Sequence, residues 1–125
     1  MSANVSTVAL KMTGQTTTTN SGDLDSISGS VGVFVVDITA FTGTTPTAVF
    51  TVEGKDPASG KYYTILQSAP LVGVGTTILR VFLGGTPAAN LIANDVVPRT
   101  FRVTCTIGGT TPALTATVGV ILNGF

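Results

Sequence analysis

Apolar and polar residues alternate along several stretches of the chain, and this period of two predicts β-strands with one buried face. In residues 100–107, four apolar side chains alternate with Thr and Arg. The same alternation occurs in residues 48–53 and 114–122. Further segments with the composition of strands are residues 5–12, 31–41, 61–67 and 76–83. The pattern therefore predicts an all-β protein.

Turn-forming residues separate these segments at intervals typical of an antiparallel β-sandwich with about 7–8 strands. The pattern does not decide between a jelly-roll and an immunoglobulin-like strand order. Only residues 87–95 could form a helix, and their Gly and Pro neighbours fit a loop with a short turn equally well. We expect one sandwich domain over residues 23–125. Residues 1–22 are polar in their second half and are expected to form either an N-terminal arm or a first strand followed by a loop.

One short motif occurs twice, as FTGTTPTA at residues 41–48 and as IGGTTPAL at residues 107–114. Each copy lies between two predicted strands, where Gly gives the backbone freedom and Pro cannot continue the hydrogen-bond ladder. The simplest interpretation is a hairpin turn that the chain uses twice. A more specific interpretation is that the domain has two related halves, or that both loops gather at one end as a contact surface.

Composition excludes several classes of function. The chain has 125 residues with six basic and six acidic side chains, no His and one Cys. Six basic residues are too few for a nucleic-acid interface, and the lack of His excludes imidazole-based catalytic triads and most zinc sites. No apolar run approaches the 18 residues of a membrane helix, and no signal peptide is visible. Because a surface so poor in charge suits a subunit better than a free monomer, we expect a multi-copy assembly.

The candidates for chemistry are few. Asp37 and Glu53 could form a catalytic carboxylate pair, but we expect them to form cross-strand ion pairs with Arg80 and Arg102. Residues 22–26 (GDLDS) could contribute oxygen ligands to a calcium ion, but turn capping explains them better. Cys105 is on the apolar face of its strand, which predicts an unreactive core thiol. We therefore predict no enzyme activity and no cofactor.

Tyr62 and Tyr63 follow a charged, Gly-containing turn and are adjacent in a predicted strand. Because neighbouring strand residues point to opposite faces, we expect one of them in the core and the other on the surface. The exposed ring could stack on a sugar. A carbohydrate- or surface-binding module is therefore an alternative function.

The segments VVDITAFTGTTP (residues 35–46), VFTVEGKD (49–56) and GKYYTIL (60–66) resemble a group of small virion proteins of tailed bacteriophages. The segment FRVTCTIGGTTP (101–112), followed by an alternating last strand, is similar too. The resemblance covers approximately residues 31–122. That group usually has a short Gly-Arg-Tyr-type sequence before its penultimate strand, whereas this chain has VPRTF at residues 97–101.

The resemblance implies a structural protein of the virion, made in the host cytoplasm and without enzymatic activity. Its expected place is the head exterior, as a decoration or cement protein that binds the major capsid protein and stabilises the shell. A tail component is the alternative within the same group. The expected contact regions are the polar N-terminal tract and three loop tips: Gln15, Thr16, Thr17, Gly43, Thr44, Thr45, Pro46, Lys55, Asp56, Lys61, Gly109, Thr110, Thr111 and Pro112.

Overall fold

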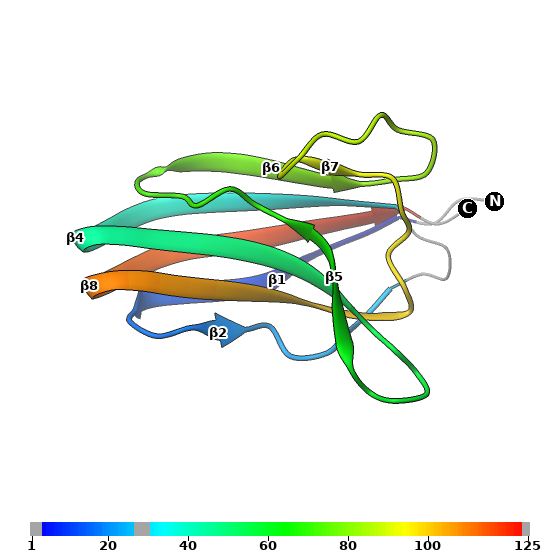
Figure 1. Ribbon diagram of the computed structural model, residues 1–125, viewed down its shortest axis with the longest axis horizontal. Helices are drawn as coiled ribbons and strands as arrows, with labels where there is room; N and C mark the ends of the chain where they lie inside the picture. The colour runs from blue at the N-terminus through cyan, green and yellow to red at the C-terminus, as the bar shows by residue number, and fades with distance from the viewer. Residues whose placement is uncertain (1–3, 27–30, 124–125) are drawn as a thin grey trace.

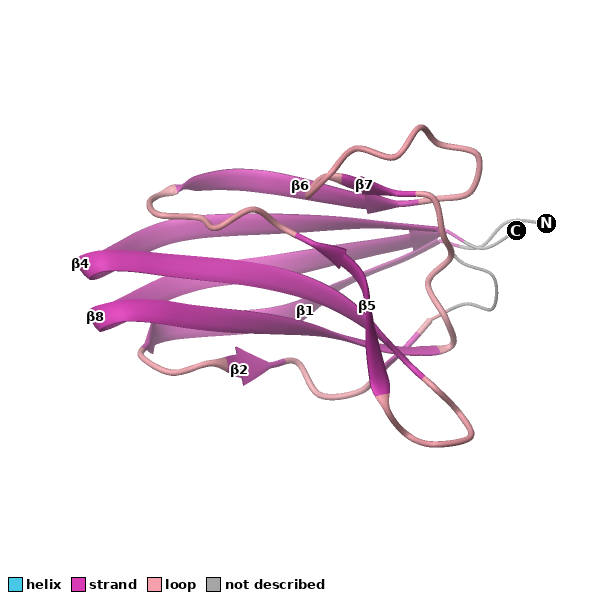
Figure 2. Cartoon of the chain, in the orientation of Figure 1, coloured by secondary structure: helices cyan, strands magenta, loops and turns pink. Residues whose placement is uncertain are grey.

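The computed structural model describes residues 4–26 and 31–123, and these residues form strands and loops with no helix (Figure 2). The strands are β1 (Asn4–Gln15), β2 (Thr19–Asn20), β3 (Leu24–Asp25), β4 (Val31–Lys55), β5 (Tyr62–Gln67), β6 (Gly75–Val81), β7 (Ile92–Ala93) and β8 (Thr100–Asn123). The predicted all-β class is confirmed. In this part of the chain there is also no helix that could cross a membrane. The remaining residues of the two predicted units (1–3, 27–30 and 124–125) lie outside the described residues.

Two long strands, β4 and β8, pair with each other over almost their whole length. Their antiparallel register runs from Val31 opposite Asn123 to Gly54 opposite Phe101, with three irregularities near the middle. Figure 1 shows both strands turning back at the same end of the molecule, away from the chain termini. One hydrogen-bonded sheet is thereby doubled over on itself.

The other strands extend this doubled sheet. The order β1-β8-β4-β6-β7 forms one half, while β2 and β3 pair with the first part of β8 and β5 pairs with the last part of β4. All pairs are antiparallel except β6 with β7, so the sheet is mixed. All eight strands belong to a single sheet by their hydrogen bonds.

The core lies between the two halves of this doubled sheet. Alternate residues of β4 and β8 are buried, as the predicted alternation of apolar positions required. Phe34 lies in the half where β4 pairs with the last part of β8, and Phe101 lies in the other half. Their rings meet edge to face with centroids 6.1 Å apart. This contact joins the two halves of the doubled sheet. Together with it, burial of the other inward-facing apolar side chains stabilises the packing of one half on the other.

One feature of the predicted secondary structure is wrong, and one alternative that the sequence left open is decided. Residues 41–48 and 107–114 were expected to end strands as hairpin turns, but they bend β4 and β8 without breaking their pairing. Residues 87–95, for which a helix and a loop with a short turn fitted the sequence equally well, form a loop with a turn at residues 89–91. An isolated bridge between Ala88 and Ile92 is followed by the short strand β7, which pairs with β6. The Gly and Pro residues beside this short apolar stretch outweigh its weak helical pattern.

The N-terminal tract belongs to the sheet over most of its length. Strand β1 pairs with the last part of β8, and its Ala9, Leu10 and Met12 side chains are buried. After a loop, β2 and β3 pair with the first part of β8. Residues 4–25 therefore cross from one half of the doubled sheet to the other.

Cys105 lies in the core with no exposed surface, as predicted. Burial raises the pKa of its thiol to about 12, because the apolar surroundings disfavour the thiolate. The reactive thiolate is therefore scarce at pH 8. We expect Cys105 to react with a disulfide reagent such as DTNB at pH 8 only after the protein unfolds in denaturant. Rapid labelling of the native protein would contradict the buried position.

Candidate protein-contact surfaces

The two Gly-Thr-Thr-Pro bends lock into each other. Thr44 of β4 is opposite Thr110 of β8, so equivalent residues of the two repeats pair. A Cβ atom at Gly43 would lie 2.9 Å from Cα of Pro112, and one at Gly109 would lie 2.8 Å from Cα of Pro46. The contacts are reciprocal, as expected for two segments related by an approximate two-fold axis.

These bends also hold unusual backbone conformations. Gly43 and Gly109 have φ of 131° and 104°, while Thr45 and Thr111 have φ of 47° and 46°. Left-handed conformations are strained for β-branched residues such as Thr. Because equivalent residues of the two repeats have similar positive φ values, both repeats form the same irregular bend. The bend is therefore an irregular part of the paired strands β4 and β8 and not the tip of a loop.

We call this end of the molecule the bend end: residues 43–46 and 109–112 with the segments that adjoin them. Gln15 of β1 is opposite Leu114, which places residues 15–17 next to the second bend. The loop before β6 lies at this end as well (Figure 1), and its Val72 and Val74 are 69% and 71% exposed. All of these segments are free of charged residues. The bend end is thus an uncharged surface with exposed Thr, Pro and Val side chains.

The predicted contact residues Lys55, Asp56 and Lys61 lie elsewhere, around the hairpin between β4 and β5. In this hairpin, Asp56 accepts hydrogen bonds from the Ala58 and Ser59 backbone and from the Ser59 hydroxyl. These bonds hold the pKa of the Asp56 carboxyl below its usual value, the Ser59 hydroxyl contributing most. The proposed set of contact residues therefore divides between the bend end and this turn.

Charged side chains concentrate near the hairpin. Four carboxylates and four cations gather there: Asp23, Asp25, Glu53, Asp56, Lys55, Lys61, Arg99 and Arg102. Lys55 Nζ lies 2.7 Å from Asp23 Oδ2, and the Tyr62 hydroxyl also donates to Asp23. The bonds from Lys55 and Tyr62 lower the pKa of Asp23, and the Asp23 carboxylate raises the pKa of Lys55. This network ties the segment before β3 to β4 and β5.

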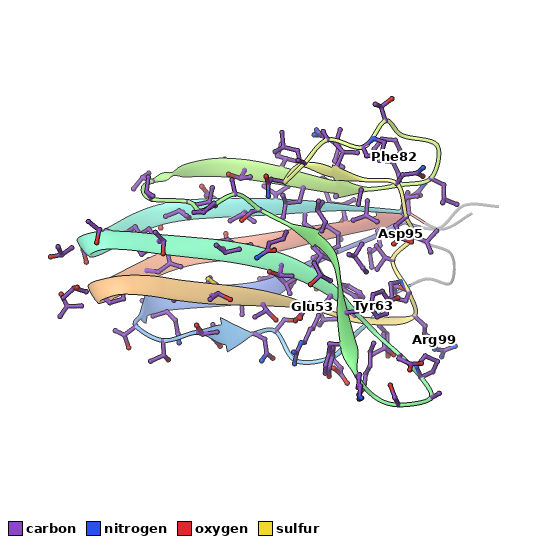
Figure 3. The ribbon with its side chains drawn as sticks, in the orientation of Figure 1. Glu53, Tyr63, Phe82, Asp95 and Arg99 are labelled. Carbon is purple, nitrogen blue, oxygen red and sulfur yellow. The ribbon has the colours of Figure 1, made fainter. Side chains whose placement is uncertain are left out.

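The two tyrosines differ from the expectation that one of them is in the core. Tyr62 is half-buried because the Arg102 guanidinium covers its ring at 3.5 Å, and Tyr63 is 47% exposed. The Tyr63 ring crosses Gly54, where a Cβ would come within 2.5 Å of it. Figure 3 shows Tyr63 and Arg99 on the half of the molecule away from the bends. Core positions near this end are filled by other side chains, such as Leu66 and Phe101.

Two open cavities of about 450 Å³ and 520 Å³ adjoin the hairpin and share Lys55, Asp56, Pro57 and Pro98. Charged side chains and Thr100 line the first, while Tyr62 and Tyr63 line the second. Only the ring of Tyr63 offers substantial open surface to a ligand, because Arg102 covers that of Tyr62.

The carboxylates considered for catalysis are far apart along β4, in different halves of the doubled sheet. Glu53 pairs with Arg102 at 2.8 Å and accepts a hydrogen bond from Thr104, so the predicted cross-strand pair is confirmed. Asp37 instead accepts a hydrogen bond from Thr76 at 3.2 Å. In the described part of the chain, no ion pair involves Asp37 or Arg80. Within the same residues, no three His, Cys, Asp or Glu side chains are grouped as metal ligands, and Asp23 of the proposed calcium segment is held by Lys55.

A third surface was not predicted from the sequence. The outer face of β1, β8, β4 and β6, opposite the core, carries Val8, Val33, Val35, Ile78 and Ile121. We call it the apolar outer face. Its signal is present in the sequence VGVFVV at residues 31–36, where apolar residues occupy both faces of one strand. The single-faced alternation of the other strands, such as residues 100–107, predicts only one buried face.

We found no match to this chain among protein-family models, curated proteins or solved structures. A functional interpretation therefore rests on the three surfaces described above.

Proposed function

We propose that the chain is a non-enzymatic structural protein of a tailed-phage virion, and that it decorates the head exterior. In this proposal its doubled sheet acts as an antiparallel β-sandwich domain, and its partner is the major capsid protein. Binding only to the assembled shell would stabilise that shell by mass action. Because many copies act together, each contact needs only moderate affinity.

The bend end is the observation that supports this proposal best. It joins three of the segments expected to make contacts, residues 15–17, 43–46 and 109–112, on one uncharged surface. Backbone atoms of its two bends approach each other closely, and we expect this contact to hold the surface in one shape, so that binding would lose little conformational entropy. Exposed Val72 and Val74 add apolar area that a protein partner could bury.

Co-sedimentation with heads that lack this protein tests the proposal. We expect saturation at a fixed copy number per head that matches the symmetry of the shell. Replacing both Val72 and Val74 with Lys should weaken binding at least tenfold, because charged side chains would have to be buried without partners. The doubly substituted protein should unfold at the same temperature as the unmodified one, since both valines are exposed.

Ala89→Lys provides the matched control, because Ala89 is exposed in the loop between β6 and β7, which contains none of the expected contact residues. This variant should bind heads as the unmodified protein does. Failure of the unmodified protein to sediment with heads would contradict a decoration role. The same assay with purified tails would then test the alternative location.

A further inference from the structure

The apolar outer face is unusual for an antiparallel sheet, whose solvent-facing side normally carries polar residues. Val8 on β1 is 64% exposed and Ile121 on β8 is 41% exposed, and the half-buried Val33, Val35 and Ile78 continue the surface beyond Ile121 onto β4 and β6. The register places them together, because Val33 is opposite Ile121 and Val35 is opposite Ile78. A contiguous apolar surface of this kind marks an interaction site.

A hollow lies in the middle of this face. It has a volume of about 370 Å³ and is lined by residues that include Val8, Val35, Gly119 and Ile121. A Cβ at Gly119 would meet nothing within 4 Å. Gly119 therefore leaves room for a side chain from outside the molecule.

Charges flank the apolar residues in a regular arrangement. Arg80 is opposite Val33 at one level of the face, and Asp37 lies four residues further along β4, opposite Thr76. Strand geometry separates the Cα atoms of Arg80 and Asp37 by roughly 14 Å, with Val35 and Ile78 between them. The face thus presents a cation on one side of an apolar centre and a carboxylate on the other side.

We propose that the apolar outer face binds the same face of a second copy of this chain. A two-fold axis in the plane of the interface, passing close to Val35 and Ile78, places Arg80 of each copy on Asp37 of the other. The strands of the two sheets then cross at about 40°, near the angle of about 30° usual for aligned sheets. The same operation brings Ile121 of one copy over the hollow at Gly119 of the second.

This arrangement is self-complementary, as a two-fold interface requires. It pairs both charges that flank the centre, and it fills the hollow with an exposed side chain of the same face. Lys11, opposite Thr117 at the β1 edge, lies outside the paired charges. The inference does not depend on a virion role, because it concerns the protein alone in solution.

Sedimentation velocity over a range of protein concentrations measures the association directly. The unmodified protein should shift from the 12.6 kDa monomer to a particle of twice that mass. Gly119→Lys should remain monomeric at concentrations where the unmodified protein is a dimer, while Thr106→Lys should dimerise normally. Thr106 is exposed on the same strand but outside the apolar outer face, so it controls for the added charge.

Charge reversal tests the geometry of the interface. Arg80→Asp places two carboxylates at each contact, and Asp37→Arg places two guanidinium groups there, so either variant should dimerise about tenfold or more weakly. A mixture of the two variants should form a heterodimer, because both contacts then join opposite charges. Native mass spectrometry resolves this heterodimer if one variant carries an isotopic label.

The proposal would be overturned if the unmodified protein stayed monomeric at protein concentrations up to several hundred micromolar. A dimer that survives Gly119→Lys together with charge reversal would also overturn it, because its interface would lie elsewhere. Protection of this face from labelling on phage heads, in a protein that is monomeric in solution, would assign it to a capsid protein instead.

Discussion

Replacing Gly43 or Gly109 with Ala should destabilise the protein by roughly 2–5 kcal/mol. Each substitution adds a methyl group within 3 Å of backbone atoms of the opposite bend, where no side chain can rotate away. Each glycine also has a positive φ, 131° and 104°, that an L-residue adopts with strain. Urea denaturation followed by circular dichroism or intrinsic fluorescence measures the loss.

Gly60→Ala is the matched control for this prediction. Gly60 has φ of 75° in the hairpin turn, but a Cβ there meets nothing within 4 Å. It should therefore lose only the conformational contribution, about 1 kcal/mol. Equal losses at all three glycines would show that the bends do not interlock. The double variant with Ala at residues 43 and 109 should lose less than the two single losses together, because both methyl groups disturb one shared contact.

The alternation of apolar residues was sufficient to predict most of the core. Residues such as Phe50 and Val103 are buried because every second side chain of a strand points to the same face. The Glu53–Arg102 pair followed from the same rule, since both residues lie on the opposite face of paired strands. Local periodicity thus identified both the buried face of the strands and a cross-strand contact on their opposite face.

The joining of four predicted strands into β4 and β8 could not be predicted in the same way. Gly and Pro usually end a strand, and here they bend it, because each bend is supported by the other across 66 residues of chain. The repeat itself was visible in the sequence. Its structural role, to bend two paired strands at the same place, depends on a long-range pairing that local turn propensities do not predict.

The environment of Tyr62 was missed for a similar reason. Alternation indicated only that Tyr62 and Tyr63 point to opposite sides of β5. It could not show that Arg102 from β8 covers one ring or that Gly54 from β4 accommodates the other. Both contacts depend on the register of three strands.

Removal of residues 2–15 should abolish cooperative unfolding. These residues include β1, which buries Ala9, Leu10 and Met12 and covers the edge of β8. Truncating a buried side chain such as Leu10 or Met12 to Ala costs about 2–5 kcal/mol. Loss of the whole strand should therefore consume most of the roughly 5–15 kcal/mol that stabilises a domain of this size. Differential scanning calorimetry of the shortened chain provides the measurement.

Point substitutions distinguish lost packing from other effects of shortening the chain. Met12→Ala should lower the free energy of unfolding by about 2–5 kcal/mol, whereas Thr13→Ala, at an exposed neighbouring position, should change it by less than about 0.5 kcal/mol. If residues 1–22 instead act as an arm that only binds a partner, the shortened chain will keep its melting temperature and lose its attachment to heads. Folding and attachment are measured separately, so a chain that unfolds assigns β1 to the core, and a folded chain that no longer binds assigns it to the contact surface.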